Sequence, residues 1–487
     1  MSVEVVHVSG LDKLTREELI GLVLKLHEGE QLQARQVEAQ AERIADLEAI
    51  VAQQAERIAY LEEQISKHGG EMKPHWVKQS KPGREPGTPR KKRTQSFSRK
   101  LLTPTKVICH AVEECPECGR KLAGGWVKWK HQVVDIPVIS VEVVDHLFIE
   151  RECGVCGKRY VPDSALVLSD VVVGKRSIGI NLMSLIAHLK TVCLVPVGKI
   201  RSFLETLYGV RISKGEIAEL LAAVSEAGES EYEKLRAEIR GSPYVHGDET
   251  GWRENGRNGY LWSFSTPDVR YFTYNHSRSG SVVMEVLSDE YLGTVVADFY
   301  GGYNVHYGLK QRCWVHFDRD LDELKEKHPD DDTVAFFRDS VLEVYWRARE
   351  TVSIGYTECE RQRLRLGFES ELLKIAQPYL GAKDTPQHVL AMRISNFIDE
   401  LFTFVEHPEV PSENNAAERA IRPAVIARKV SGGTRSARGS KTKSVLMSLF
   451  GTWTAQGLNT YDACRQMIIR HNHTKTACAP VTSLSQN

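Results

Sequence analysis

The sequence predicts a multidomain protein with an amino-terminal coiled coil, a zinc-binding β module, a helical region and a mixed α/β core interrupted by an all-α insertion. Three observations predict this order. Apolar residues recur every seven positions near the start, two Cys-x-x-Cys pairs follow, and strand-like runs then alternate with helical segments. At 487 residues and 41% hydrophobic content, the chain can bury more than one core.

A seven-residue repeat of apolar side chains predicts a coiled coil over residues 15–66. β-Branched residues at the a positions and leucines at d positions favour two parallel strands. We therefore expect a homodimer or a higher homo-oligomer formed through this segment. The alternative is one long amphipathic helix that packs on its own chain. The seam consists of Val37, Ile44, Leu47, Val51, Ile58, Leu61 and Ile65.

The next segment, residues 67–104, is predicted to be a flexible basic linker. Between residues 67 and 100 it contains eleven Lys or Arg against two Glu. Such a composition cannot bury a core, and its charge suits contact with phosphates. A solvated linker without a partner is the alternative. The predicted DNA-binding cations here are Arg90, Lys91, Lys92 and Arg93.

Two Cys-x-x-Cys pairs predict a structural zinc site within residues 105–165. Four thiolates with no open position are typical of zinc that stabilises a fold. We expect residues 132–151 to form a β-hairpin between the pairs, and Cys109 or His110 could replace one ligand. Buried free cysteines or a redox pair are the alternatives. The predicted zinc ligands are Cys115, Cys118, Cys153 and Cys156.

Residues 166–240 are predicted to be helical. Apolar residues at helical spacing fill the first part, and a Val-Pro-Val-Gly segment at 195–198 interrupts it. A helix expected over residues 199–207 and a capped helix over residues 213–227 resemble a helix-turn-helix, which would bind DNA. A compact helical packing domain is the alternative, because the pattern lacks a charged recognition face.

The segment 241–319 is predicted to begin the α/β core. Its first strand-like run leads to Asp248, two further runs follow after turn residues, and a helix is expected from Ser281 to Leu287. A β-branched run then ends on Asp298. In this order the first and fourth strands can lie side by side, which would bring Asp248 and Asp298 together. Two neighbouring carboxylates repel each other unless a divalent cation lies between them.

The later part of the chain is predicted to be helical. Residues 320–410 show helical periodicity without a strand-like run, so we expect an all-α insertion in the core. Residues 411–473 are expected to return to the core as helices, and residues 474–487 to form a disordered tail. The insertion would separate Asp248 and Asp298 from a third candidate acid, Glu418, which lies after it in the sequence.

Glu418 is the preferred third acid, and Glu413 is its rival. Glu418 shares a helix face with Arg422, which suits a metal ligand beside a phosphate contact. His316 could contact the metal-bound phosphate or orient a catalytic group, although a histidine beside Trp is more often structural. Together with Arg422, the cations expected to bind DNA on this helix are Arg419, Arg428 and Lys429.

Several motifs in these segments resemble transposases of the insertion sequence 66 family. The resemblance implies a bacterial enzyme with a ribonuclease H-like Asp/Asp/Glu core. By position it implies that Asp248, Asp298 and Glu418 are the catalytic acids, and oxygen ligands suit Mg²⁺ or Mn²⁺. The motifs are Asp-Glu-Thr-Gly-Trp at 248–252, Asp-Phe-Tyr-Gly-Gly-Tyr at 298–303, Cys-Trp-Val-His at 313–316 and Asn-Asn-Ala-Ala-Glu-Arg-Ala-Ile-Arg-Pro at 414–423.

The resemblance also implies a function. The enzyme would bind transposon ends, cut a phosphodiester with two metal ions and join the freed 3′ hydroxyl to target DNA. Accessory proteins of the same element would be further partners. A ribonuclease H-like nuclease without strand transfer is one alternative, and a catalytically inactive, zinc-containing DNA-binding regulator is the other.

Composition indicates the cellular location and the kinds of partner that we expect. The formal net charge is zero, so a nucleic-acid surface must come from local clusters. No apolar run approaches the ~18 residues of a membrane span, and the start lacks a signal peptide. Ten cysteines without a secretory signal favour reduced thiols and metal binding. We therefore expect a cytoplasmic protein with no membrane partner.

Overall fold

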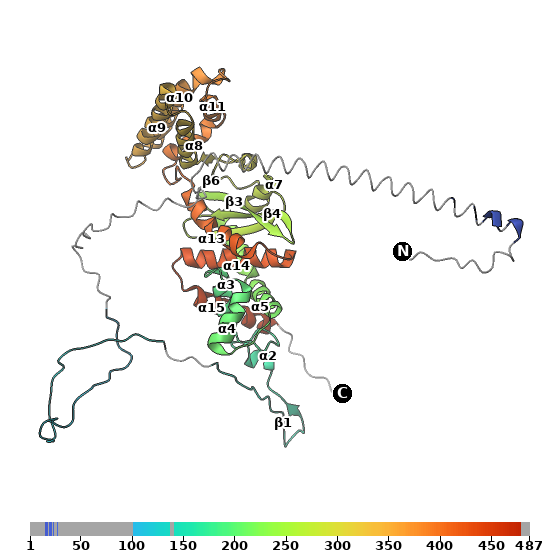
Figure 1. The fold of residues 1–487 in the computed structure, drawn as a ribbon, viewed down its shortest axis with the longest axis vertical. Helices are drawn as coiled ribbons and strands as arrows, with labels where there is room; N and C mark the ends of the chain where they lie inside the picture. Colours follow the sequence, from blue (N-terminus) through green and yellow to red (C-terminus); the bar gives the residue numbers. More distant parts are fainter. Residues whose placement is uncertain are drawn as a thin grey trace. The chain divides into compact units, whose positions relative to one another are not determined.

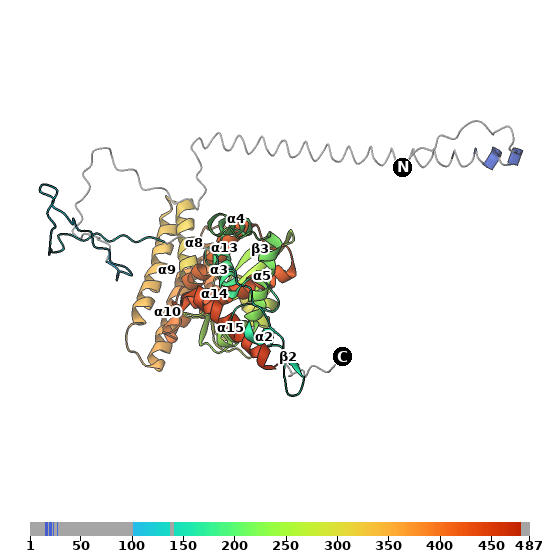
Figure 2. The ribbon, with the colours of Figure 1, turned by 90° about the horizontal axis from the view of Figure 1, so that it is seen from below.

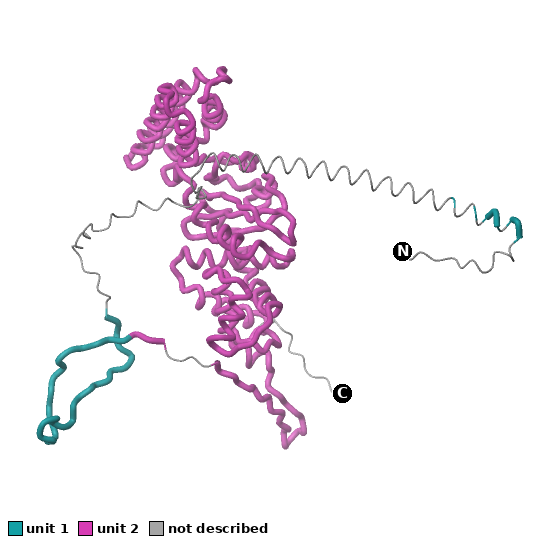
Figure 3. The backbone as a smooth tube through the Cα atoms, in the orientation of Figure 1, with its two compact units in different colours: residues 1–133 teal, residues 134–487 magenta. Residues whose placement is uncertain are grey.

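The computed structural model describes residues 15–17, 19–21, 23, 27, 101–136 and 141–478. The chain divides into two compact units, residues 1–133 and residues 134–487 (Figure 3). Most of the predicted coiled coil, the basic run Arg90 to Arg93 and residues 479–487 lie outside the described residues, so these predictions are not tested. Among the described residues, no helix is long and apolar enough to cross a membrane.

A five-stranded mixed sheet forms the centre of the second unit (Figure 1). Its order is β5, β4, β3, β6, β7; the pairs among β5, β4 and β3 are antiparallel, and those among β3, β6 and β7 are parallel. The first and fourth strands are therefore neighbours, as predicted. At three residues, β7 is too short to be recognised from sequence. The strands are β3 (Tyr244–Glu254), β4 (Arg257–Ser265), β5 (Arg270–Asn275), β6 (Thr294–Ala297) and β7 (Lys310–Arg312).

The turns between the strands follow the sequence prediction. Asn255 and Gly256 join β3 to β4 with φ values of 47° and 80°, the left-handed conformation that a two-residue type I′ hairpin turn requires. In the next turn, the N–H of Val269 donates to Oγ1 of Thr266 at 3.0 Å. The helix α7 spans Ser281–Leu287, as predicted.

The two faces of the sheet are covered by different elements, because successive residues of a strand point to opposite faces. On one face, Trp252 of β3 packs in a cluster with α13 (Asn415–Ser431). On the other face, Trp262 of β4 contacts the ring of Tyr303 with centroids 6.0 Å apart. Tyr303 lies in the 3-10 helix η2 (Gly301–Val305).

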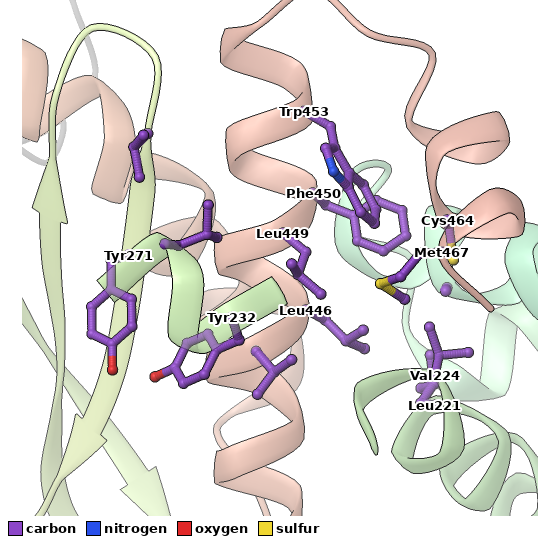
Figure 4. Close-up of a cluster of buried hydrophobic side chains, with 14 of the residues drawn as sticks. Leu221, Val224, Tyr232, Tyr271, Leu446, Leu449, Phe450, Trp453, Cys464 and Met467 are labelled. Carbon is purple, nitrogen blue, oxygen red and sulfur yellow. The ribbon is translucent and has the colours of Figure 1, made fainter. Parts of the chain in front are cut away.

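A layer of helices packs on the sheet through α14 (Ala437–Ala455). Figure 1 shows α14 between the strands and the helices α3, α5 and α15. Figure 4 shows this core, in which Leu449 and Phe450 of α14 lie near Met467 of α15 and Val224 of α5. The helices of the layer are α3 (Ile180–Thr191), α4 (Val197–Tyr208), α5 (Lys214–Ala227), α6 (Glu229–Arg240) and α15 (Thr460–Cys478).

The helix α5 begins where the sequence predicts, because Oγ of Ser213 accepts the N–H of Glu216 at 3.0 Å. Its apolar side is buried in the core shared with α14 and α15. Its exposed acids Glu219 and Glu226 bind Arg438. An acidic outer face does not suit a DNA groove. These contacts favour the packing alternative over a helix-turn-helix.

The segment between β7 and α13 is helical, as its periodicity predicts, and has a core of its own. Trp314 stacks on Tyr345 with ring centroids 4.5 Å apart, and its Nε1 donates to the carbonyl of Leu401 at 2.6 Å. Figure 2 shows α8, α9 and α10 side by side. The helices are α8 (Trp314–Lys327), α9 (Asp332–Thr351), α10 (Glu358–Leu380), α11 (His388–Leu401) and α12 (Thr403–Glu406).

The β-hairpin expected over residues 132–151 is wrong for the described part of that range. Residues 132–136 and 141–150 contain no strand. A hairpin needs one covered face, and the side chains that would form it, such as Val143 and Leu147, are exposed. The strands in this region are instead the two-residue pair β1 (Arg151–Glu152) and β2 (Arg159–Tyr160), followed by α2 (Ser164–Val167).

The expected disordered tail also begins too early. The helix α15 continues through residues 474–478. Its last turns are anchored at Asn472, whose Nδ2 donates to the carbonyls of Ser169 and Val172 at 2.7 and 2.8 Å. Because these acceptors lie about three hundred residues away in the chain, local sequence does not reveal the anchor.

Candidate active site: an acidic cluster between the sheet and a helix

Asp248 and Asp298 are aligned on neighbouring parallel strands. His246 of β3 pairs with Val296 of β6, and two residues further along each strand come the two aspartates. Asp298 directly follows β6, whereas Asp248 lies in the middle of the longer strand β3. The expectation that both project from strand ends is therefore wrong for Asp248, because the β3–β4 hairpin extends the strand beyond it. The predicted proximity of the two strands is confirmed.

The carboxyl group of Asp248 is largely buried on the face of the sheet that α13 covers. Burial and, to a smaller extent, the charges of Glu249, Asp298 and Glu418 together raise the pKa of Asp248 to about 7. The N–H of Glu249, which donates to Oδ1 of Asp248 at 2.8 Å, opposes this shift. Near neutral pH this carboxyl is therefore about half protonated. A cation near it would favour the ionised form.

Asp298 is held by the turn that follows β6. Its Oδ1 accepts the N–H of Tyr300 at 2.9 Å. Its carbonyl accepts Nη1 of the buried Arg312 at 2.7 Å, and Nε of Arg312 donates to Glu400 of α11 at 2.5 Å. The turn that carries Asp298 is thus tied to the helical insertion.

Glu418 lies in the first turn of α13 and faces the start of α8. Its Oε1 is 3.2 Å from Nη1 of Arg319 and 3.5 Å from Nε2 of His316. Nδ1 of His316 is buried and has no hydrogen-bond partner within the described part of the chain. The histidine of the Cys-Trp-Val-His motif therefore lies beside the third acid, where it can orient the carboxylate.

Glu413, the rival third acid, has a different electrostatic neighbourhood. Its charge contributes to the pKa of His246 and of Tyr345. The charge of Glu418, in contrast, contributes to the pKa of Asp248. The charge of Glu418 is therefore among the causes of the raised pKa of Asp248.

Asn414 fixes the start of α13 against β3, a role that sequence reasoning misses. Its Oδ1 accepts Nδ1 of His246 at 2.8 Å, and its Nδ2 donates to the carbonyl of Gly247 at 2.8 Å. Its own N–H donates to Sγ of Cys313 at 3.0 Å. Through its side chain and its backbone N–H, this one buried residue joins the start of α13 to β3 and to Cys313. The signal in the sequence is its place within the motif that carries Glu418.

Glu249 is a second residue that the sequence does not single out. It lies on the opposite face of β3 from Asp248, where Oε2 accepts the hydroxyl of Tyr303 at 2.8 Å and Oε1 accepts Nη2 of Arg278 at 2.7 Å. Burial raises the pKa of Glu249, and these two hydrogen bonds oppose the shift. The Tyr303 ring lies so close to Gly247 that a Cβ there would be 2.5 Å from it. Glu249 therefore links β3 to Tyr303 and Arg278 on the face of the sheet opposite Asp248.

The predicted DNA-binding cations of α13 have different surroundings. Arg419, Arg422 and Lys429 are exposed. Arg428 is half-buried, and its Nη1 donates to the carbonyl of Gly251 at 2.8 Å, so it positions α13 on β3. The exposed arginines are the ones that suit a phosphate contact.

The donor chemistry of the acidic cluster fits a hard divalent cation, since its ligating atoms are carboxylate oxygens. A buried aspartate whose neighbours are acids also gains from positive charge. Within the described residues, no three His, Cys, Asp or Glu side chains converge on a ready-made metal position. Cation binding would therefore draw the carboxylates closer together.

The two cysteine pairs occupy turns of the same kind. In each, the N–H of the first cysteine donates to the carbonyl five residues on, and the glycine four residues on donates back, at 2.8 to 2.9 Å. Gly119 and Gly157 have φ values of 70° and 65°, which favour glycine. Hydrogen bonds from backbone N–H groups within each turn lower the pKa of Cys115 and of Cys153. This favours the thiolate form that binds zinc. The first turn belongs to one unit and the second to the other.

The fold and the site together define a mixed α/β protein with an acidic cluster on adjacent parallel strands. The family model described as "Transposase IS66 family" matches residues 175–442, which is more than half of the chain and includes all three acids. The chain therefore belongs to the IS66 family of transposases.

A curated relative is the "Uncharacterized protein y4jO" of Sinorhizobium fredii (strain NBRC 101917 / NGR234). It is 31% identical over 166 residues, which is 34% of this chain and 49% of the relative. The chain thus spans about half the length of the relative that it matches.

Proposed function

We propose that this protein cuts the ends of its element and joins them to target DNA, with Asp248, Asp298 and Glu418 as the carboxylates that bind Mg²⁺ or Mn²⁺. The observation that carries the proposal is the electrostatic coupling of the three acids. The charges of both Asp298 and Glu418 raise the pKa of the buried Asp248. Acids that are far apart in sequence and repel one another at a buried position are typical of a functional site.

Each residue of the acidic cluster would have a different role in metal binding. Divalent cations bound there would supply the positive charge that the phosphoryl-transfer transition state requires. Asp248 would release the proton that it holds near neutral pH as the cation binds. Glu418 would exchange its contact with Arg319 for the cation, and His316 would keep the carboxylate oriented.

The flanking groups would hold the DNA strand. Arg419 and Arg422 are exposed on the helix that carries Glu418, so their guanidinium groups can contact phosphates beside the scissile bond. Arg428 and Asn414 would hold α13 on β3 through the bonds described above. A change in either would displace Glu418 without removing a ligand.

The proposal is tested with labelled element-end DNA, target DNA and Mg²⁺. The unmodified chain should cut and join, whereas Asp298→Ala should lose both reactions by on the order of a thousandfold and still bind DNA. Asp289→Ala is a matched control, since this exposed aspartate lies in the loop after α7. Joining by Asp298→Ala at the normal rate would refute the assignment of the acids.

The same assay separates the two alternative functions. Release of cut DNA without joining by the unmodified chain would indicate a nuclease without strand transfer. Neither cutting nor joining in the presence of Mg²⁺ would indicate a DNA-binding regulator. Either outcome overturns the proposed transposition chemistry.

We also propose that Cys115, Cys118, Cys153 and Cys156 bind one structural zinc ion. The matching turn geometry and the lowered pKa of the first thiol in each turn support this. Elemental analysis of the purified full-length chain should find one zinc per chain, and Cys153→Ser should reduce it. A zinc content that Cys153→Ser does not change would contradict the proposal.

A further inference from the structure

A cavity of about 200 Å³ lies at the far end of α13 from Glu418. It is bordered by α3, α5, α13, α14 and the end of β3, which are neighbours in Figure 1. We call it the lysine pocket, after Lys190 of α3 and Lys443 of α14. Its other lining groups include Trp252, Ser431 and Thr434. None of these groups belongs to the acidic cluster.

The two lysines of the pocket lack an acidic partner among the described residues. Nζ of Lys190 donates to Oγ of Ser431 at 3.3 Å, and Nζ of Lys443 lies 5.5 Å from the centre of the Trp252 ring. The carboxylate that lines the cavity, Glu219, is already bound to Arg438. The pocket therefore contains two half-buried amines without a compensating negative charge.

Two other cations of α14, the helix that carries Lys443, are neutralised by carboxylates. Arg438 binds two glutamates of α5, and Lys441 binds Glu229 at 2.8 Å and lies over the Tyr232 ring. Lys443, two residues further on, points into the pocket. The contrast shows that α14 has acids available for its exposed cations and leaves this one without.

The electrostatic state of the pocket favours an anion. Burial and, to a smaller extent, the charge of Lys190 together lower the pKa of Lys443 to about 7. Burial also lowers the pKa of Lys190. A bound anion would reverse both shifts, because it stabilises the charged form of each amine.

Apolar side chains such as Leu221 and Leu446 line part of the pocket, and a hydroxyl of the loop after α13 is fixed at its edge. Oγ1 of Thr434 accepts Nε1 of Trp252 at 3.1 Å and contacts Oγ of Ser440 at 2.6 Å. Gly433 has a φ of 126°, and a Cβ there would be 2.2 Å from the carbonyl of Arg253. Glycine is thus required for the loop to approach β3, and this loop contributes Thr434 to the lining of the pocket.

We propose that the lysine pocket binds a phosphate group of the DNA strand whose scissile phosphate lies at the acidic cluster. The inference rests on the proposed function and adds a second contact to it. Glu418 and Ser431 are thirteen residues apart on α13, about 20 Å along the helix. At a rise of ~3.4 Å per nucleotide, the two sites are on the order of six nucleotides apart along one strand.

The first test measures the affinity of the full-length chain for labelled DNA, without divalent cations, over a series of salt concentrations. Lys443→Gln should weaken binding about tenfold and reduce the slope of log affinity against log salt by about 1, as for one lost phosphate contact. Lys190→Gln should act in the same direction. Lys441→Gln is the matched control, because its charge is already neutralised by Glu229. Equal slopes for Lys443→Gln, Lys190→Gln and the unmodified chain would overturn the proposal.

The second test separates a DNA phosphate from a free anion. Inorganic phosphate should raise the melting temperature of the unmodified chain above that in chloride of equal ionic strength, and Lys443→Gln should lose this shift. If phosphate stabilises the chain but the DNA slopes are unchanged, the pocket takes a free anion and the DNA assignment is wrong. Because neither measurement requires cleavage, failure of the proposed catalysis would leave the result for the pocket intact.

Discussion

Acidic side chains gather at the first turn of α13, and two lysines lie at its last turn. At its first turn lies Glu418, whose charge raises the pKa of Asp248. At its last turn, Ser431 lies beside Lys190 and Lys443. Burial raises the pKa of Asp248 to about 7 and lowers the pKa of Lys443 to about 7. Each cluster is thus incomplete, and the sign of its charge indicates the ligand that would complete it, a divalent cation at one end and a phosphate at the other.

Some charged groups elsewhere among the described residues are neutralised by the protein itself. Arg438 and Arg365, for example, each bind two carboxylates. An ion pair of this kind satisfies both partners and leaves no demand for a ligand. The comparison therefore distinguishes sites by whether the protein supplies the compensating charge itself.

The largest expected effect separates the two candidate third acids. Glu418→Gln should reduce cleavage of element-end DNA by on the order of a hundredfold or more, because a ligand facing Asp248 is lost. Glu413→Gln should retain most activity, because the charge of Glu413 acts on the pKa of His246 and Tyr345. Rates measured at saturating DNA decide between them. If Glu413→Gln alone lost activity, Glu413 would be the third acid and the assignment of Glu418 would be wrong.

A smaller effect concerns stability at the acidic end. Because the folded pKa of Asp248 is raised, the folded state binds more protons than the unfolded state between about pH 4 and pH 7, so stability falls as pH rises through this window. Asp248→Asn removes that penalty. It should raise the free energy of unfolding by ~2 kcal/mol above pH 7, less than the full shift because the site is partly open to solvent.

The measurement for Asp248→Asn is denaturant unfolding at several pH values, in buffers free of divalent cations. The gain over the unmodified chain should disappear as the pH falls toward 4. A gain of the same size at pH 4 and pH 8 would mean that the pKa of Asp248 is not raised.

The smallest effect is the pH dependence of stability caused by Lys443, which has the opposite sign to that of Asp248. The lowered folded pKa of Lys443 means that the folded state binds fewer protons between about pH 7 and pH 10, so stability from this group rises with pH over that range. Lys443→Gln should therefore be more stable by about 1 kcal/mol below pH 7, and the gain should vanish toward pH 10. The gain is smaller than for Asp248 because a lysine side chain can extend toward solvent.

This prediction is checked by the same unfolding experiment in phosphate-free buffer. Addition of phosphate should cancel the advantage of Lys443→Gln, since the unmodified pocket would then hold its anion. Parallel pH profiles for Lys443→Gln and Asp248→Asn, in place of opposite ones, would break the comparison between the two ends of α13.

Much of the fold could be predicted from local sequence because the signals act over a few residues. The Asn255-Gly256 turn, the Ser213 cap and the bounds of α7 depend on neighbouring atoms alone. Alternation and helical periodicity likewise identify β4, β5 and the helices of the insertion. The hairpin expected over residues 132–151 fails for the complementary reason, since a strand pattern without a surface to cover does not form a sheet.

The sequence by itself determined the strand order that brings Asp248 beside Asp298, and it singled out the three acids and the four cysteines as candidate site residues. The tertiary structure alone decided how those residues behave. Asn414 binds Gly247 across 167 residues, and Lys443 of α14 lines the same cavity as Lys190 of α3. Burial and the distance between charges set a pKa and the need for a ligand, and both quantities arise only when remote segments pack together.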